Sequence, residues 1–469
     1  MKKLCFILFF LSAVQARAQS PGQLLENSVK TLEADSQMRH ALLGLYVIDR
    51  KSGKVIVDRN SQIGLAPAST QKLLTSIAAI DMMGISFRYA TNIYFEGIQH
   101  LDTLDGNMII QGSGDPTFGS WRFNNTSAEN IFNSIFSAIA RTGINVINGN
   151  IIISDTVFDS GSIPAGWIWE DIGNYYGAGV WGLNWRENQY DLLLRAGNDE
   201  NDSVQIIGTR PEMNISPFIN ELKTGPKGSG DRAFIYFSPY LAKGFVRGTI
   251  PPGEKNFIIS GSMPSGPLQF ADELDKELKK HKIIVSGQIF TGKDFQMKNR
   301  LQHSLNRLLI SFLSPSLDSV NYWFLKKSIN LYGEALLKTF AHQKTGIGTT
   351  EKGIETMLDF WSQNGIEKSA IQVMDGSGLS PQNRVTAYAL VRSLKYAATR
   401  PWFNSFYQAL PEINGMRMKS GSIEGARSFA GYHRSRSGVE YVFAIIVNNY
   451  SGSSSLLVKK MWELLDILK

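Results

Sequence analysis

The pattern of apolar residues changes along this chain, and that change most constrains its fold. Towards both ends, helical periodicity stands beside short apolar strands, whereas from about residue 89 short strands alternate with Gly-rich turns. A chain of 469 residues is also too long for one ordinary core. We therefore predict an α/β (α+β) protein whose two ends share one sheet, with the middle of the chain as an insertion.

The predicted elements follow from the same periodicity. Near the ends we expect helices over 21–38, 69–83 and 455–468, and strands over 41–48, 55–57, 428–433 and 441–447. In between we expect an all-β stretch over 186–262, strands over 107–111, 148–153 and 283–289, and helices over 130–142, 270–280, 304–313, 316–342, 350–364 and 386–399.

The first residues read as a secretory signal peptide. Lys2 and Lys3 precede the apolar run Leu4 to Leu11, and Ala16-Arg17-Ala18 supplies the small residues of a cleavage site. The alternative, a membrane anchor, needs a longer apolar run to cross about 30 Å of bilayer. Cys5 stands at the start of the run instead of ending it, which argues against a lipoprotein. We predict cleavage after residue 18 and a periplasmic protein without a transmembrane anchor.

Composition narrows the classes further. Removal of Lys2, Lys3 and Arg17 lowers the formal charge from +7 to +4 and also removes the single Cys, so we expect no disulfides. The remaining charge is too dispersed to indicate nucleic acid. The six His are scattered without a ligand-like pair, so we predict neither a metal site nor a cofactor.

A serine followed by a lysine three residues later occurs once, at Ser69-Thr70-Gln71-Lys72. Residues i and i+3 share one face of a helix, so the Lys72 amine can reach the Ser69 hydroxyl. An amine with a lowered pKa can take the proton that a serine must lose to become a nucleophile. For this tetrapeptide alone, the alternative is a serine N-cap followed by a surface lysine.

Two further motifs occur three times each, so a single copy of either does not indicate a catalytic site. They are Ser-x-Asn at 304–306, 319–321 and 328–330, and Lys-[Ser/Thr]-Gly at 223–225, 344–346 and 419–421. Chemistry with a Ser-x-x-Lys nucleophile needs Ser-x-Asn between helices and Lys-Ser-Gly on a strand beside the cleft. Lys419-Ser420-Gly421 precedes two strands and a helix, whereas Gly346 reads as a helix cap.

Longer stretches make the arrangement specific. They are 66–73 (APASTQKL), 112–117 (GSGDPT), 166–180 (GWIWEDIGNYYGAGV), 314–339, which contains Ser328 and Asn330, and 375–380 (DGSGLS). Together they resemble the penicillin-binding proteins, and among them the class C low-molecular-mass D-alanyl-D-alanine carboxypeptidase/endopeptidases (peptidase family S13, the penicillin-binding protein 4 type). The resemblance spans essentially the whole chain after residue 18. This sequence differs from the family pattern at Ile329, where Asp is frequent, and at Ser420, where Thr is commoner.

The resemblance implies a serine DD-peptidase of peptidoglycan, with an antiparallel catalytic sheet flanked by helices and smaller β-rich inserted domains. It implies a catalytic domain over 19–88 and 296–469, an inserted domain II over 89–185 and 263–295, and a nested domain III over 186–262. Peptidoglycan peptide stems would be the substrate and β-lactams covalent inhibitors, while the oligomeric state stays open, a homodimer included.

The implied roles are as follows. Ser69 attacks, Lys72 is the base, Ser328 relays the proton, Asn330 holds the substrate amide and Lys419 adds positive potential. Ser420, Gly421 and Ser422 belong to the substrate-binding strand, and the N–H groups of Ser69 and Ser422 form the oxyanion hole. The 167–181 aromatics suggest core packing more than a glycan surface, and Asp375 a turn cap more than a catalytic group.

Three alternatives remain open from the sequence. One is another serine acyl hydrolase on the same fold, such as a β-lactamase or an esterase, which would need a deacylating carboxylate near Ser69. The second is a non-catalytic peptidoglycan-binding protein. The third is an exchange reaction that makes cross-links, because the choice between water and an amine as acceptor is not readable, nor is the balance between carboxypeptidase and endopeptidase action.

Overall fold

A computed structural model describes residues 20–213, 218–239, 241, 243–292 and 307–469. The predicted signal peptide over 1–18 and the Ser-x-Asn copy at 304–306 lie outside the described residues. Within the described part of the chain, no helix combines the length and the apolar character needed to cross a bilayer.

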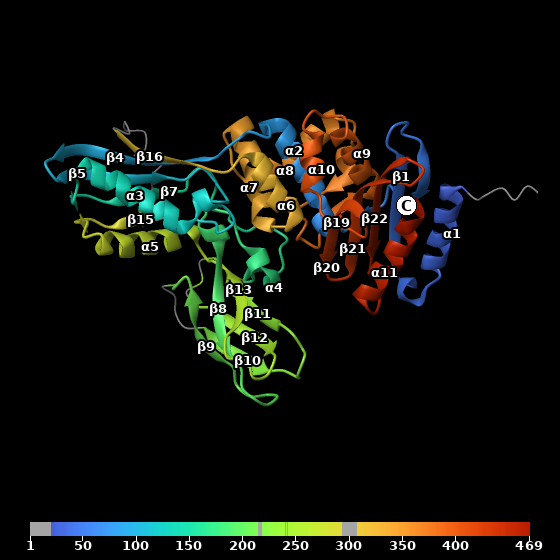
Figure 1. Cartoon of the computed structure of the whole chain (residues 1–469), viewed down its shortest axis with the longest axis horizontal. Helices are drawn as coiled ribbons and strands as arrows, with labels where there is room; N and C mark the ends of the chain where they lie inside the picture. The colour runs from blue at the N-terminus through green and yellow to red at the C-terminus, as the bar shows by residue number, and fades with distance from the viewer. Residues whose placement is uncertain (1–19, 214–217, 240, 242, 293–306) are drawn as a thin grey trace, which may run out of the picture.

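The two ends of the chain share one sheet, as predicted. It has six antiparallel strands in the order β19-β20-β21-β22-β1-β2. Their bounds are β1 Leu42–Asp49, β2 Val55–Arg59, β19 Glu412–Ile413, β20 Met416–Ile423, β21 Ala426–Arg434 and β22 Glu440–Asn448. β1 pairs with β22 from Leu42 opposite Asn448 to Asp49 opposite Tyr441, so this contact joins strands from the two ends of the chain (Figure 1).

Helices cover both faces of this sheet. On one face lie α1 (Pro21–Glu33) and α11 (Ser454–Leu465), whose apolar sides bury one cluster against the strands. The other face carries a larger cluster that holds α2 Lys72–Met83, α6 Leu317–Lys326, α7 Asn330–Thr345, α8 Thr350–Gln363, α9 Ala387–Ala397 and α10 Phe403–Ala409. α2 is buried on nearly every side, as expected for a helix that is apolar all round.

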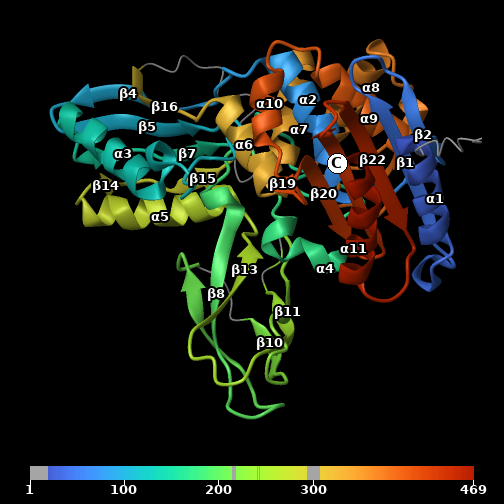
Figure 2. The same ribbon diagram turned by 45° about the vertical axis from the view of Figure 1, so that its right-hand side comes forward.

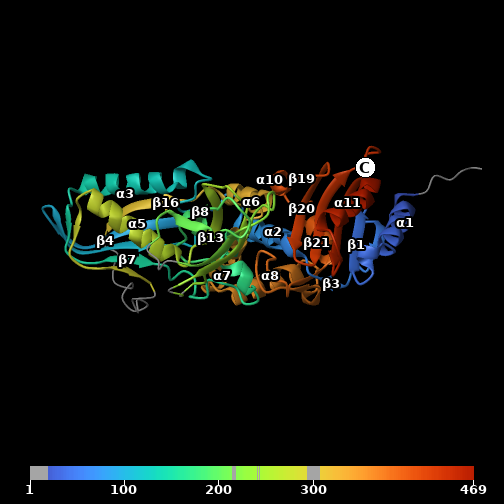
Figure 3. The same ribbon diagram turned by 90° about the horizontal axis from the view of Figure 1, so that it is seen from below.

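The inserted region forms a second sheet at the other end of the molecule (Figure 1). Its strands are β4 Ala90–His100, β5 Thr103–Gln111, β6 Val146–Ile147, β7 Ile151–Ser154, β14 Ile284–Val285, β15 Ile289–Thr291 and β16 Arg307–Leu313. The helices α3 (Ala128–Thr142) and α5 (Gly266–Lys280) pack side by side into one apolar cluster with this sheet (Figure 3).

A smaller all-β unit projects away from both sheets (Figures 1 and 2). One three-stranded sheet holds β8 (Gln189–Arg195), β9 (Gln205–Arg210) and β13 (Phe257–Ser262), and the other holds β10 (Ile219–Thr224), β11 (Arg232–Tyr236) and β12 (Phe245–Ile250). Their facing apolar residues form a separate core. The short helix α4 (Trp169–Ile172) packs against β11, beside the catalytic sheet.

Two helix predictions are wrong. Residues 307–313 of the predicted 304–313 helix form β16, which pairs antiparallel with β4. A short apolar run fits both periodicities, and here the neighbouring strand β4 decided the outcome. We propose that the inserted region extends to Leu313 instead of ending at 295. The single helix predicted over 316–342 is two helices, because Ser328 adopts a left-handed backbone with φ +58° between α6 and α7.

Candidate active site

Ser69 lies on a tight turn that begins the central helix. The turn Ala68–Gln71 is a 3-10 segment that continues directly into α2. Its first residue, Ala68, has a φ of +46°. Such a conformation costs about 1–3 kcal/mol and persists only where neighbours hold it. Here the Pro67 carbonyl accepts hydrogen bonds from Thr70 Oγ1 at 2.7 Å and from Ser428 Oγ on β21 at 2.6 Å.

Lys72 is fully buried behind Ser69. Its Nζ donates to Ser69 Oγ at 3.0 Å, to Asn330 Oδ1 at 2.6 Å and to the Ser377 carbonyl at 2.6 Å. Burial lowers the pKa of Lys72 well below its usual value, and the charge of Lys419 lowers it further, whereas Asp375 and Glu334 act in the opposite direction. Burial thus favours loss of a proton from the amine that contacts the serine hydroxyl.

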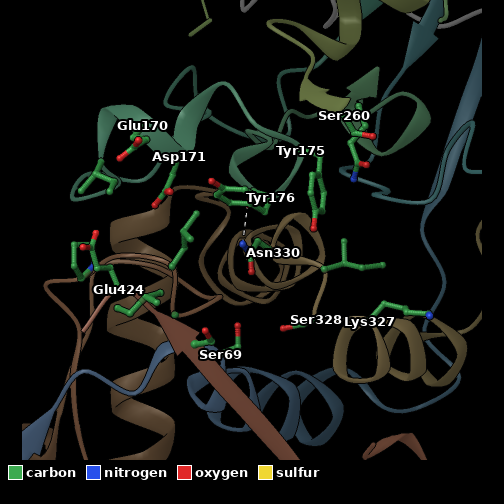
Figure 4. Close-up of a pocket in the computed structure, with 18 of the residues that line it drawn as sticks. Ser69, Glu170, Asp171, Tyr175, Tyr176, Ser260, Lys327, Ser328, Asn330 and Glu424 are labelled. Atoms are coloured by element: carbon green, nitrogen blue, oxygen red, sulfur yellow. Dashed lines mark hydrogen bonds between the residues drawn. The ribbon is translucent and has the colours of Figure 1, made fainter. Parts of the chain in front are cut away.

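Ser328 and Asn330 occupy the break between α6 and α7. Ser328 lines the same cavity as Ser69, while Asn330 begins α7. The Asn330 amide is fixed from both sides, because Oδ1 accepts from Lys72 and Nδ2 donates to the Tyr176 carbonyl at 2.7 Å (Figure 4). The positive φ at Ser328 thus turns the chain so that Ser328 and Asn330, two residues apart, both line the cavity.

Lys419, Ser420, Gly421 and Ser422 run along β20 beside the serine turn. A Cβ on Gly421 would lie 2.4 Å from the Pro67 carbonyl oxygen and 3.0 Å from Ser69 N, so only glycine allows this approach. Lys419 is buried, its Nζ donates to the Ser420 carbonyl at 2.9 Å, and burial lowers its pKa to about 7. Ser422 lines the cavity.

Asp375 organises a loop that closes on the serine turn. Its Oδ1 accepts from the backbone N–H of Gly378 and from the side-chain amides of Gln71 and Asn383. Its Oδ2 accepts from Ser380 N at 2.7 Å and from Trp167 Nε1 at 2.9 Å. The prediction of a turn-capping role for Asp375 is confirmed. The same loop supplies the Ser377 carbonyl to Lys72.

A cavity of about 900 Å³ opens above Ser69. Residues of the catalytic sheet, of the inserted region and of the all-β unit line it together, and its charges are mixed. The basic side chains are Arg122, Lys327 and Arg427, and the acidic ones are Glu170, Asp171 and Glu424 (Figure 4). Burial raises the pKa of Asp171 to about 6, against the opposing effect of a hydrogen bond from Tyr176.

The aromatic stretch 167–181 packs only partly in the core. The prediction of core packing therefore holds for Trp167 and Trp181 but not for Trp169 and Tyr175. Trp167 and Trp181 are buried, whereas Trp169 and Tyr175 are 48% and 51% exposed. Tyr175 and Tyr176 line the cavity. The exposed Trp169 packs against Tyr236 and Phe245 of the all-β unit.

The other copies of the short motifs lie elsewhere. Asn321 is buried within α6, where it accepts a hydrogen bond from Ser76 Oγ. Lys223 lies on β10 of the all-β unit, and Gly346 caps α7 in the left-handed conformation, as predicted for the copy at 344–346. The structure thus brings Ser69, Lys72, Asn330 and Lys419 together and places the look-alike copies at 319–321, 223–225 and 344–346 away from them.

Several contributors to the site were not predicted from the sequence. The carbonyls of Tyr176 and Ser377 act through the backbone, which no residue type reveals. Glu334, four residues after Asn330 on α7, is buried, accepts from Gly376 N at 2.9 Å, and has its pKa raised by burial to about 8. The available signal for Glu334 was its position one helical turn after Asn330, on the same face of the helix.

Comparison with known proteins places this geometry in context. The family model described as D-Ala-D-Ala carboxypeptidase 3 (S13) matches residues 25–462. A D-alanyl-D-alanine carboxypeptidase of Actinomadura sp. (strain R39) is 25% identical, the alignment covering 96% of this chain and 86% of that protein. The DacB carboxypeptidase of Haemophilus influenzae is 22% identical, with 87% and 86% covered.

The fold has a solved counterpart. The crystal structure of penicillin binding protein 4 (dacB) from Haemophilus influenzae superposes with a TM-score of 0.79 at 20% sequence identity, covering 95% of this chain and 99% of that one. The same protein complexed with a β-lactam superposes with a TM-score of 0.73. The antiparallel catalytic sheet with its helices and insertions is therefore shared.

Proposed function

The chain belongs to the D-Ala-D-Ala carboxypeptidase 3 (S13) family, and from this premise we propose that Ser69 cleaves the bond between D-alanine residues in peptidoglycan stems. The protein is a serine-type D-alanyl-D-alanine carboxypeptidase. The observation that carries the assignment to Ser69 is its hydrogen bond to the fully buried Lys72, whose pKa is lowered. An amine whose pKa is lowered gives up its own proton more readily, and in its neutral form it can accept the serine proton.

We propose the following sequence of events. Ser69 Oγ forms a bond to the carbonyl carbon of the penultimate D-Ala, and its proton passes to Lys72 Nζ. The C–N bond then breaks, and the departing amine receives that proton from Lys72 through Ser328. Water hydrolyses the ester left on Ser69, which returns the serine hydroxyl and releases the shortened stem.

Substrate positioning is assigned to β20 and the start of α7. Asn330 Nδ2 carries two hydrogens and the Tyr176 carbonyl accepts one, so the other can be donated to the substrate amide. The close approach of Gly421 to Ser69 N supports an oxyanion hole from the N–H groups of Ser69 and Ser422. Each such donor is typically worth about 3–4 kcal/mol. Lys419, with Ser420 and Ser422, would attract the terminal carboxylate.

We also propose that β-lactams acylate Ser69 and that the protein acts in the periplasm on peptidoglycan stems. The first proposal rests on the fold shared with the β-lactam-bound relative, and the second on the predicted signal peptide at 1–18. A cavity with both acidic and basic side chains suits a stem that carries free amino and carboxyl groups.

The test is labelling with a fluorescent penicillin, read by intact-mass spectrometry. We expect one adduct on the wild type and none on Ser69→Ala, while Ser319→Ala, the serine of the look-alike motif on α6, labels like the wild type. Absence of an adduct on folded wild-type protein would refute acylation by β-lactams. Equal labelling of Ser69→Ala would mean that another serine is acylated.

A second assay decides between the remaining activities. A peptide ending in D-Ala-D-Ala and a cross-linked dimer are offered separately, with and without an added amine acceptor. Release of D-Ala indicates carboxypeptidase action, conversion of the dimer indicates endopeptidase action, and a new amide with the acceptor indicates exchange. A protein that hydrolyses only the β-lactam would instead be a β-lactamase.

A further inference from the structure

We propose that a groove between α6 and α10 binds a sugar unit of the glycan strand to which the stem peptide is attached, an inference that rests on the proposed function. The groove has a volume of about 530 Å³. Its aromatic side chains are Phe123, Tyr322 and Trp323, and its polar side chains include Asp318, Asn404 and Gln408. We call it the α6–α10 groove.

The chemistry of the α6–α10 groove fits an N-acetylated sugar. Tyr322 is 40% exposed and its ring meets that of Trp323 edge to face, with centroids 5.5 Å apart. The C–H faces of a sugar ring pack on such aromatic surfaces, while its hydroxyl and acetamido groups need donors and acceptors. Asn404 and Gln408 are exposed one turn apart on α10 and offer both.

The carboxylate in the groove is held in place. Asp318, on the first turn of α6, accepts a hydrogen bond from Ser405 Oγ of α10. This contact joins the two helices that form the groove and fixes an acceptor within it. An apolar peptide ligand would form no hydrogen bonds with this carboxylate or with the two side-chain amides. A sugar can pack on the aromatic rings and also form hydrogen bonds with the carboxylate and the amides.

One arginine connects the lining of the catalytic cavity to the lining of the groove. Arg122 lines that cavity, and its guanidinium lies 5.3 Å from the ring centroid of Trp323, which lines the groove. Its Nε also donates to the buried Glu187 at 2.9 Å, which fixes its position. Arg122, held by Glu187, therefore lies beside both sites.

The two sites are close enough for one substrate to occupy both. Trp323 lies three residues, about 4–5 Å along the helix axis, before Lys326 at the end of α6, and Ser328 follows two residues later in the chain. A stem of four residues between the attacked carbonyl and the glycan spans at most about 14 Å. A substrate that fills both sites binds the second one as an intramolecular event, which raises its effective concentration.

The experiment compares kcat/KM for two substrates that differ only in the sugar. One is a free pentapeptide ending in D-Ala-D-Ala, and the other is the same pentapeptide on the N-acetylglucosaminyl-N-acetylmuramoyl disaccharide. We expect the wild type to favour the disaccharide form about tenfold. Tyr322→Ala and Gln408→Ala should lower that ratio several-fold, while Tyr322→Phe, which keeps the ring, retains it. Gln363→Ala, an exposed Gln at the end of α8, is the matched control.

A second readout separates this inference from the proposed function. Saturation-transfer NMR on Ser69→Ala protein with the peptide-free disaccharide should show contact that Tyr322→Ala in the same background removes. Contact of this kind without cleavage of either peptide by the wild type would overturn the proposed function and leave the groove supported. Equal kcat/KM for both substrates, an equal loss on both in Tyr322→Ala, or no saturation transfer would each overturn the groove.

Discussion

Two regions meet at Ser69 and differ in their contact with water. The floor of the cavity, defined by Ser69, Lys72, Asn330 and Lys419, comes from the catalytic domain, and its two lysines are buried. The wall, defined by residues 168–176 of the inserted region, carries the half-exposed Trp169 and Tyr175 and the carboxylates Glu170 and Asp171. The floor excludes water from its amines, whereas the wall faces the solvent-filled cavity.

This difference assigns separate tasks to the two regions. In the floor, burial makes the charged forms of Lys72 and Lys419 costly, so their pKa values fall and a neutral base becomes available. In the wall, the half-exposed side chains of Trp169 and Tyr175 are accessible to a ligand. The floor is thus suited to proton transfer and the wall to recognition, and mutations in the two regions should differ in kind.

The largest effect is expected from Lys72→Met. Methionine fills a similar volume but cannot accept the Ser69 proton, so acylation by a β-lactam should slow about 10³-fold, within the usual range for a general base. The rate is measured by stopped-flow labelling, with retained fold checked by circular dichroism. Lys326→Met, at a half-buried lysine near the end of α6, is the control. A Lys72→Met rate within tenfold of the wild type would remove the proposed role of Lys72.

A smaller, pH-dependent effect is expected from Lys419. Its pKa of about 7 means that it is charged below pH 7 and loses its charge as the pH rises. The preference for a peptide with a free C-terminal carboxylate over its C-terminal amide should therefore fall about tenfold from pH 6 to pH 8.5. Using the ratio of the two substrates cancels the titration of Lys72, which affects both.

Lys419→Met should show no such change in preference with pH, because it has no charge to lose. Lys344→Met, from the look-alike copy at 344–346, should titrate like the wild type. A pH-dependent preference that persists in Lys419→Met would assign the carboxylate contact to another group.

The smallest effect is expected where the wall joins the floor. Trp167→Phe removes the hydrogen bond to Asp375, worth about 1 kcal/mol, and should loosen the loop that supplies the Ser377 carbonyl to Lys72. Acylation should slow about threefold. The control is Trp361→Phe, a buried Trp whose Nε1 has no hydrogen-bond partner among the described residues. An equal slowing in both variants would attribute the effect to lost packing alone.

The fold was largely predictable where periodicity was long. The pairing of β1 with β22, the buried α2 and the all-β stretch followed from apolar spacing and from the order of elements. The failures lie where local sequence fits two structures. Residues 307–313 fit both a helix and a strand, and pairing with the edge of β4 decided for the strand. The helix break at Ser328 has a left-handed backbone, and no glycine or proline at that position indicated it in the sequence.

For the site, the sequence alone determined the chemistry that is local. Ser69 and Lys72 are three residues apart on one turn, so their contact needs no tertiary information. Only the tertiary structure decided the rest. It placed Asn330 and Lys419 beside Lys72, brought the carbonyls of Tyr176 and Ser377 to the amine of Lys72 and the amide of Asn330, and buried Lys72 and Lys419. A pKa shift depends on exclusion of water and on charges distant in sequence, and both arise only when the chain has packed.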